Sequence, residues 1–142
     1  MYTILHDAHY YLRYFVLATL LIVILMSLLG LVNKKPFGVW DNRFSLFLLI
    51  FTHIQFLVGL GLYYFSSHVQ FNAETMKNKD IRYWTVEHIF GMLIAVVLIT
   101  IARSTSKRMA NDQAKHKRLF IFNLIALIVI LIVIALSGRR IL

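Results

Sequence analysis

The stretch that decides the fold runs from Arg82 to Arg103, with the sequence RYWTVEHIFGMLIAVVLITIAR. A base and an aromatic pair open it, and an apolar run of about 20 residues leads to the next base. As a helix rising about 1.5 Å per residue, such a run spans the roughly 30 Å hydrocarbon core of a bilayer. Two ionisable residues, Glu87 and His88, lie inside it. Ionisable groups are costly in hydrocarbon, so they mark a functional site by default.

Small residues follow His88 on its own helical face. Gly91 and Ala95 stand three and seven positions further on, so they lie beneath the histidine. A planar cofactor held by His88 could lie in the flat groove that they leave. The alternative is a packing notch for a neighbouring helix, with His88 hydrogen-bonded across the interface. Met92 has two similar interpretations, as a thioether ligand of haem iron or as core packing.

The composition places the chain in lipid. Of its 142 residues 60% are hydrophobic and 15% are charged, and the mean hydropathy is +0.75. A soluble domain of this size cannot hide so much apolar surface. The net charge of +9 comes from bases between apolar runs, which indicates membrane topology and anionic lipid, not nucleic acid. There is no cysteine, which excludes disulfides, covalent c-type haem and thiolate-bound clusters, but not haem held by histidines.

Four apolar runs of spanning length predict an all-α, integral membrane, up-down-up-down four-helix bundle forming a single domain over 1–142. The first run lacks the order of features of a cleaved signal peptide, so it is interpreted as a retained helix. Asp41 or Asn42 is the expected N-cap of the second helix. Residues 104–118 are expected to be a basic loop. The expected helices cover residues of about 3–32, 42–66, 82–103 and 115–137.

Lysine and arginine counts predict the orientation. Nine of these bases lie at the first and third connections, and six lie at or near the opposite side. The positive-inside rule therefore predicts that those connections are cytoplasmic and that both termini lie outside.

Depth selects the histidines that can act together. His9 and His88 lie about 7–9 Å below the outer ends of their helices, whereas His53 lies about 10 Å off that level, near the midplane. A six-coordinate b-type haem needs two imidazoles from facing helices at one depth, which predicts His9 and His88 as axial ligands. Arg13 or Arg82 could pair with a haem propionate.

Other histidines have competing interpretations. His6 and His9 could bind zinc with Asp7 and Glu87 nearby. The pair of His53 and Gln55 could meet a quinone headgroup, His53 could ligate a second haem, or its side chain could make a packing hydrogen bond. His116, in the expected basic loop, is interpreted as a solvated residue.

Four segments of the chain look familiar together, namely His9-Tyr10-Tyr11-Leu12-Arg13-Tyr14, His53 to Gly59, Arg82 to His88, and Lys115-His116-Lys117. With them the whole chain resembles a family of small bacterial four-helix membrane proteins often labelled "cytochrome B". The first helix is also weakly similar to that of bacterial cytochromes of the b561 type. Those hold two haems on four histidines, some of them from the fourth helix, whose span here has none. The resemblance therefore implies haem b, but not a two-haem arrangement.

The sequence thus predicts a b-type cytochrome of the bacterial cytoplasmic membrane that passes electrons between the quinone pool and a protein partner. It would be a carrier or a subunit, alone or as a homo-oligomer, not a complete enzyme. The alternative is a cofactor-free accessory subunit of a larger membrane complex.

Overall fold

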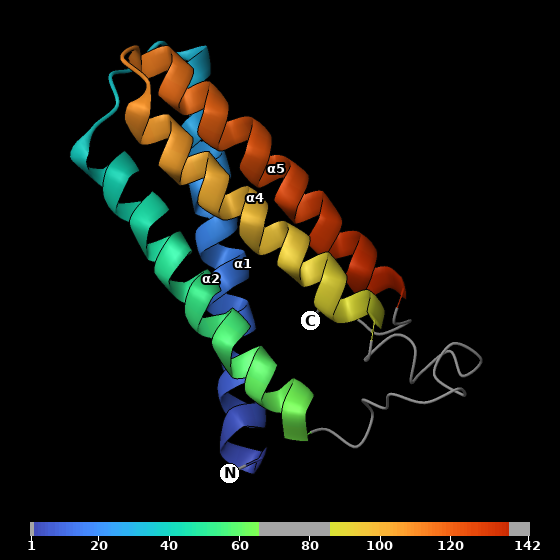
Figure 1. Cartoon of the computed structure of the whole chain (residues 1–142). Coiled ribbons are helices and arrows are strands. Elements are labelled where there is room, and N and C mark those ends of the chain that lie inside the picture. Colours follow the sequence, from blue (N-terminus) through green and yellow to red (C-terminus); the bar gives the residue numbers. More distant parts are fainter. Residues whose placement is uncertain (1, 66–85, 137–142) are drawn as a thin grey trace.

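The computed structural model describes residues 2–65 and 86–136, and these form four helices and no strand (Figure 1). They are α1 (Tyr2–Val32), α2 (Val39–Phe65), α4 (His88–Arg108) and α5 (Asp112–Leu136). Each is long and apolar enough to cross a membrane. The predicted all-α, four-helix membrane fold is confirmed.

The helix ends differ from the predicted ones at the basic end of the bundle. α2 begins at Val39, α4 continues to Arg108 and α5 already starts at Asp112, so the connection expected over residues 104–118 is reduced to 109–111. Neither Asp41 nor Asn42 is the N-cap of α2, because both lie inside its first turns. The predicted bounds follow the apolar runs closely, but a helix needs no hydrocarbon around it and continues past the span. Of the predicted helical residues, 66, 82–85 and 137 lie outside the described residues.

Local hydrogen bonds fix the two short connections. After α1, Lys34 adopts a positive φ of 52°, and the Lys35 N–H donates to the Gly30 carbonyl at 2.9 Å. A left-handed residue followed by such a bond is the usual way to end a helix. Before α5, the Asn111 side-chain oxygen accepts from the N–H groups of Gln113 and Ala114, which makes Asn111 the N-cap.

Each helix buries a narrow stripe of residues with alternating spacings of three and four. Such a repeat keeps one face on the bundle axis. α1 packs on α2 and α5, and α4 packs on α5 and α2, so α1 and α4 lie diagonally opposite each other. The buried stripes comprise Val16, Leu20, Val23, Ser27 and Gly30 on α1; Ser45, Leu48 and Thr52 on α2; Ala95, Ile99, Ala102 and Ser106 on α4; and His116, Leu119, Asn123, Ala126, Ile130 and Val133 on α5.

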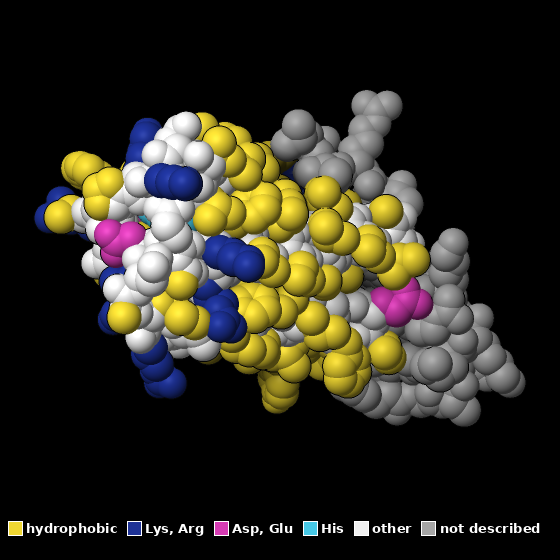
Figure 2. Space-filling view, turned by 90° about the horizontal axis from the view of Figure 1, so that it is seen from above, with side chains coloured by type: hydrophobic (Ala, Val, Ile, Leu, Met, Phe, Trp, Pro, Cys, Tyr) yellow, Lys and Arg dark blue, Asp and Glu magenta, His cyan; other side chains and the backbone are white. Residues whose placement is uncertain are grey.

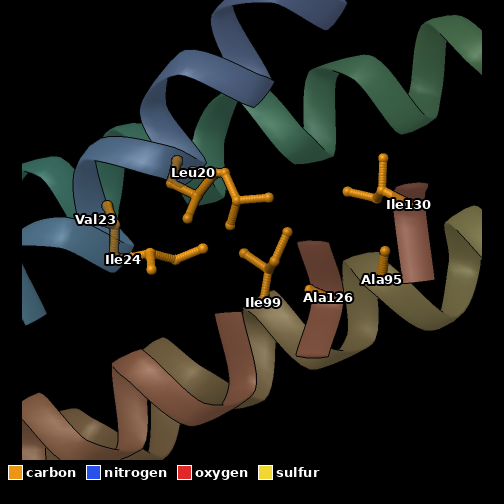
Figure 3. Packing of buried hydrophobic residues seen from close by; sticks show 8 residues of the cluster. Leu20, Val23, Ile24, Ala95, Ile99, Ala126 and Ile130 are labelled. Atoms are coloured by element: carbon orange, nitrogen blue, oxygen red, sulfur yellow. The ribbon is translucent and has the colours of Figure 1, made fainter. Parts of the chain in front are cut away.

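The apolar core lies midway along these stripes. Leu20, Val23 and Ile24 of α1 face Ile99 of α4 there (Figure 3). The side chains of α4 and α5 at their contact are small, including Ala102 and Ala126, which lets the two backbones approach closely. On the outside, hydrophobic side chains form a broad band, and lysines and arginines gather at one end (Figure 2).

The two ends of the bundle differ in packing. The connections 33–38 and 109–111 lie together at one end, here called the basic end. Toward the opposite end, which carries the N-terminus, the pair α1 and α2 diverges from the pair α4 and α5 (Figure 1). That opposite end, here called the histidine end, contains His9 and His88.

Candidate functional site

The candidate site is the pair formed by His9 and His88. His9 continues the buried stripe of α1 outward, four residues before Arg13, and His88 continues that of α4, four residues before Met92. The two rings meet across the bundle with their centroids 6.3 Å apart and their planes at 71°. Both residues are partly buried. The structure thus brings together the two histidines that depth matching selects, from diagonally opposite helices.

The His9 ring lies against α2. A Cβ added at Gly59 would stand 3.3 Å from its Cε1 and 3.7 Å from its Nδ1, so the glycine makes room for the ring. The Gln55 side-chain Nε2 donates to the His9 carbonyl at 2.9 Å. His9 Nδ1 and Gln55 Oε1 are both buried, and neither has a hydrogen-bond partner among the described residues. Buried polar atoms nearly always have a hydrogen-bond partner. Two buried atoms without one, in residues that contact each other, therefore indicate a site for a further polar partner.

Arg13 lies one turn deeper than His9. Its guanidinium stacks on the rings of Tyr10 and Tyr14, at 4.4 and 4.8 Å from their centroids, and its Nη2 donates to the Tyr14 hydroxyl at 2.9 Å. The Nε atom is buried without a partner, and no described carboxylate pairs with this cation. Arg13 therefore keeps an unused N–H beside the histidine pair.

The groove expected beneath His88 is filled by a neighbouring side chain. A Cβ on Gly91 would overlap Cγ2 of Val133 on α5, and Ala95 is buried in the apolar core. Met92 packs against the same core. In this structure Gly91 is a packing notch, which is the alternative interpretation of that glycine.

His53 and Gln55 point to different places, although they are close in sequence. His53 is exposed on the outside of the bundle, and its Nε2 lies 3.1 Å from the Thr100 hydroxyl of α4. Gln55 is directed inward, to the His9 carbonyl. The two residues therefore do not share one polar site, and the hydrogen bond of His53 joins α2 to α4.

The other candidate ligands do not assemble into a metal site. His6 is exposed, with its Nδ1 at 3.7 Å from the Asp7 carboxylate. Among residues 2–65 and 86–136, no three His, Cys, Asp or Glu side chains are grouped to hold a metal ion, which leaves the zinc hypothesis without support. Arg82, the other proposed propionate partner, lies outside the described residues.

His116 is the residue that sequence reasoning misjudged. It is not solvated: only 1% of it is exposed, and its ring packs 5.3 Å from that of Phe37. A Cβ on Gly30 would lie 2.6 Å from both ring nitrogens, and Nε2 stands 3.0 Å from the Lys35 carbonyl oxygen. The signal was available, since His116 is in phase with Leu119 and the rest of the α5 stripe.

Comparison with protein-family models, with curated proteins and with solved structures finds no match for this chain.

Proposed function

We propose that this protein is a b-type cytochrome of the membrane, with His9 and His88 as the two axial ligands of one haem. The observation that carries the proposal is the 6.3 Å separation of the two imidazole centroids. Imidazole nitrogen binds a transition metal at about 2.0–2.1 Å, and a ring adds about 1 Å to its centroid, so two rings opposed across one metal stand about 6 Å apart. The donor set fits, because neutral histidines from two helices are the usual axial pair in bundles.

Other observations at the histidine end support the same group. The pair α1 and α2 diverges there from the pair α4 and α5 (Figure 1), and His9 and His88 come from one helix of each pair. The unused Arg13 N–H suits a propionate carboxylate, with which guanidinium forms charge-assisted bonds. When bound, the haem supplies one-electron redox chemistry, and the protein holds, orients and electrostatically tunes it.

The proposed partners follow from the surroundings. The exposed His53 beside Thr100 offers a hydrogen-bonding pair on the lipid side of the bundle, where a quinone headgroup could dock. The excess of bases at the basic end favours its placement in the cytoplasm of a bacterium, with the histidine end and both termini outside. The protein would then carry electrons between the quinone pool and a membrane partner or a second copy.

Purification from cells supplied with haem precursor tests the proposal directly. The wild-type protein should show a reduced-minus-oxidised spectrum of low-spin haem, and both His9→Ala and His88→Ala should lose it while their helicity persists. His6→Ala is the matched control, since it removes an exposed histidine from the same helix, and it should retain the spectrum. A normal spectrum in His88→Ala would refute the ligand pair.

A cofactor-free accessory subunit is the second candidate, and two observations favour it. Val133 fills the Gly91 notch. His53 and Gln55 already bond to neighbouring helices, as structural polar residues do in membranes at about 0.6–1 kcal/mol each. Wild-type protein that is purified without any haem would support this function.

A further inference from the structure

The basic end contains a buried arginine whose hydrogen-bond partners are all neutral. Arg103 of α4 is 7% exposed, and its Nη1 donates to the Asn42 carbonyl at 3.0 Å, to the Asn42 side-chain oxygen at 3.1 Å and to the Ser45 hydroxyl. No described carboxylate pairs with it. A buried cation without an anion is costly, so its retention calls for a counter-charge.

One edge of this guanidinium is free to bind that counter-charge. The Nε and Nη2 atoms of Arg103 make no hydrogen bond to a described residue. Neither atom is among the fully buried polar atoms without a partner, so both retain some exposed surface. The bonds of Nη1 to Asn42 and Ser45 fix the plane of the group. An immobilised guanidinium edge with two parallel N–H donors matches two oxygens of a phosphate.

The charge around Arg103 is strongly positive. The basic end has nine bases but only two acids, Asp41 and Asp112, and none of these bases forms an ion pair with a described carboxylate. The Asp41 carboxylate accepts a hydrogen bond from the Gly38 N–H instead. The bases are Lys34, Lys35, Arg43, Arg103, Lys107, Arg108, Lys115, Lys117 and Arg118.

The surroundings also place this positive group at the surface of a bilayer. Arg43, next to Asn42, has its guanidinium 5.1 Å from the ring of Trp40, which is exposed as interfacial tryptophans are. Further toward the bundle centre both helices expose apolar side chains, Phe47 on α2 and Ile101 on α4. A ligand at this position would contact basic side chains with its polar part and exposed apolar side chains with its hydrocarbon part.

We propose that Arg103 binds the phosphodiester of an anionic phospholipid in the leaflet at the basic end. The headgroup phosphate pairs with the Nε–Nη2 edge of Arg103, and the acyl chains lie over Phe47 and Ile101. A freely soluble phosphate would have the same contacts to the arginine but none to the apolar side chains. This inference is independent of whether the histidine end holds haem.

Tryptophan quenching can test the site in vesicles. In a Trp84→Phe background Trp40 is the one remaining tryptophan, and phosphatidylglycerol with brominated chains should quench it more than brominated phosphatidylcholine at equal mole fraction. Arg103→Gln should lower the apparent affinity for phosphatidylglycerol about tenfold, because a charge-assisted bidentate pair is lost. Arg103→Lys should lose most of the preference too, because lysine keeps the charge but not the two-pronged geometry.

The controls separate this site from general attraction and from soluble anions. Lys117→Gln removes an exposed base from the same end and should change the affinity less than twofold. Equal losses in the Lys117 and Arg103 variants would show diffuse attraction and overturn the proposal. Full competition for the site by glycerophosphoglycerol, which is the phosphatidylglycerol headgroup without acyl chains, would also overturn the proposal. If Arg103→Gln does not fold, Arg103→Lys decides alone: an unchanged lipid preference makes the arginine purely structural.

Discussion

The close contact between Gly30 and the His116 ring predicts that even a methyl group at position 30 destabilises the fold. In Gly30→Ala, the new Cβ would stand 2.6 Å from both nitrogens of the His116 ring, whereas ordinary contacts are 3.4–4 Å. The shortfall of about 1 Å cannot be relieved by a small shift, because the ring is fully buried and its Nε2 is held at the Lys35 carbonyl. We expect the substitution to cost about 1–3 kcal/mol of unfolding free energy, the usual cost of overpacking.

The sign of the effect should reverse once the ring is removed. A His116→Ala background removes the three atoms nearest to the new Cβ, all of them in the His116 ring, and alanine then favours the helix by up to about 1 kcal/mol. Unfolding in mixed micelles, followed by circular dichroism while the fraction of sodium dodecyl sulfate rises, measures all four proteins of this double-mutant cycle. Gly38→Ala is the control, because its Cβ would meet only an oxygen at 3.6 Å. Equal destabilisation by Gly30→Ala with and without His116 would refute the reasoning.

Three further outcomes follow from the buried positions. Gly91→Ala should destabilise the fold by about 1–3 kcal/mol, and adding Val133→Ala should recover most of that loss in the same micelle assay. Asn123→Leu should be neutral or stabilising, because both amide atoms are buried without partners; a loss above about 1 kcal/mol would reveal a hidden partner. In haem-loaded protein, Gln55→Leu should shift the midpoint potential measured by redox titration, because Gln55 holds the His9 backbone; an unchanged potential would contradict that positioning role.

The fold could be predicted from the sequence because hydrocarbon offers no hydrogen-bond partner to the backbone of a membrane span. A run of about 20 apolar residues can satisfy its backbone only as a helix, so four such runs predict four helices. Their ends were less predictable, since polar residues continue a helix freely once it leaves the hydrocarbon. Residues 104–108 illustrate this: the Thr105 and Ser106 hydroxyls bond to carbonyls of their own helix, and α4 continues to Arg108.

The candidate site was predictable only in part. The rise per residue of a helix is fixed, so depth alone matched His9 with His88 before any packing was known. Depth does not say which way a side chain points, and His116 was therefore misjudged although its spacing from Leu119 and Asn123 follows the buried stripe. The space beside Gly91 could not be assigned either, because the sequence does not show that Val133 of another helix fills it.

Buried polar atoms without a described hydrogen-bond partner occur along the whole bundle, and they include His116 Nδ1 at the basic end and the side-chain amide of Asn123. At the basic end, Lys35 accepts hydrogen bonds from two side chains of α5, and Arg103 bonds α4 to α2, so all four helices are joined there. At the histidine end the helix pairs diverge, and the side chains of His9, Arg13 and Gln55 each leave a buried nitrogen or oxygen unused. A ligand that joins the diverging helix pairs should stabilise the histidine end more than the basic end, where the helices are already joined. Haem loading should therefore protect amides near His9 from hydrogen exchange more than those near Lys35, which a purely structural role for the histidines does not predict.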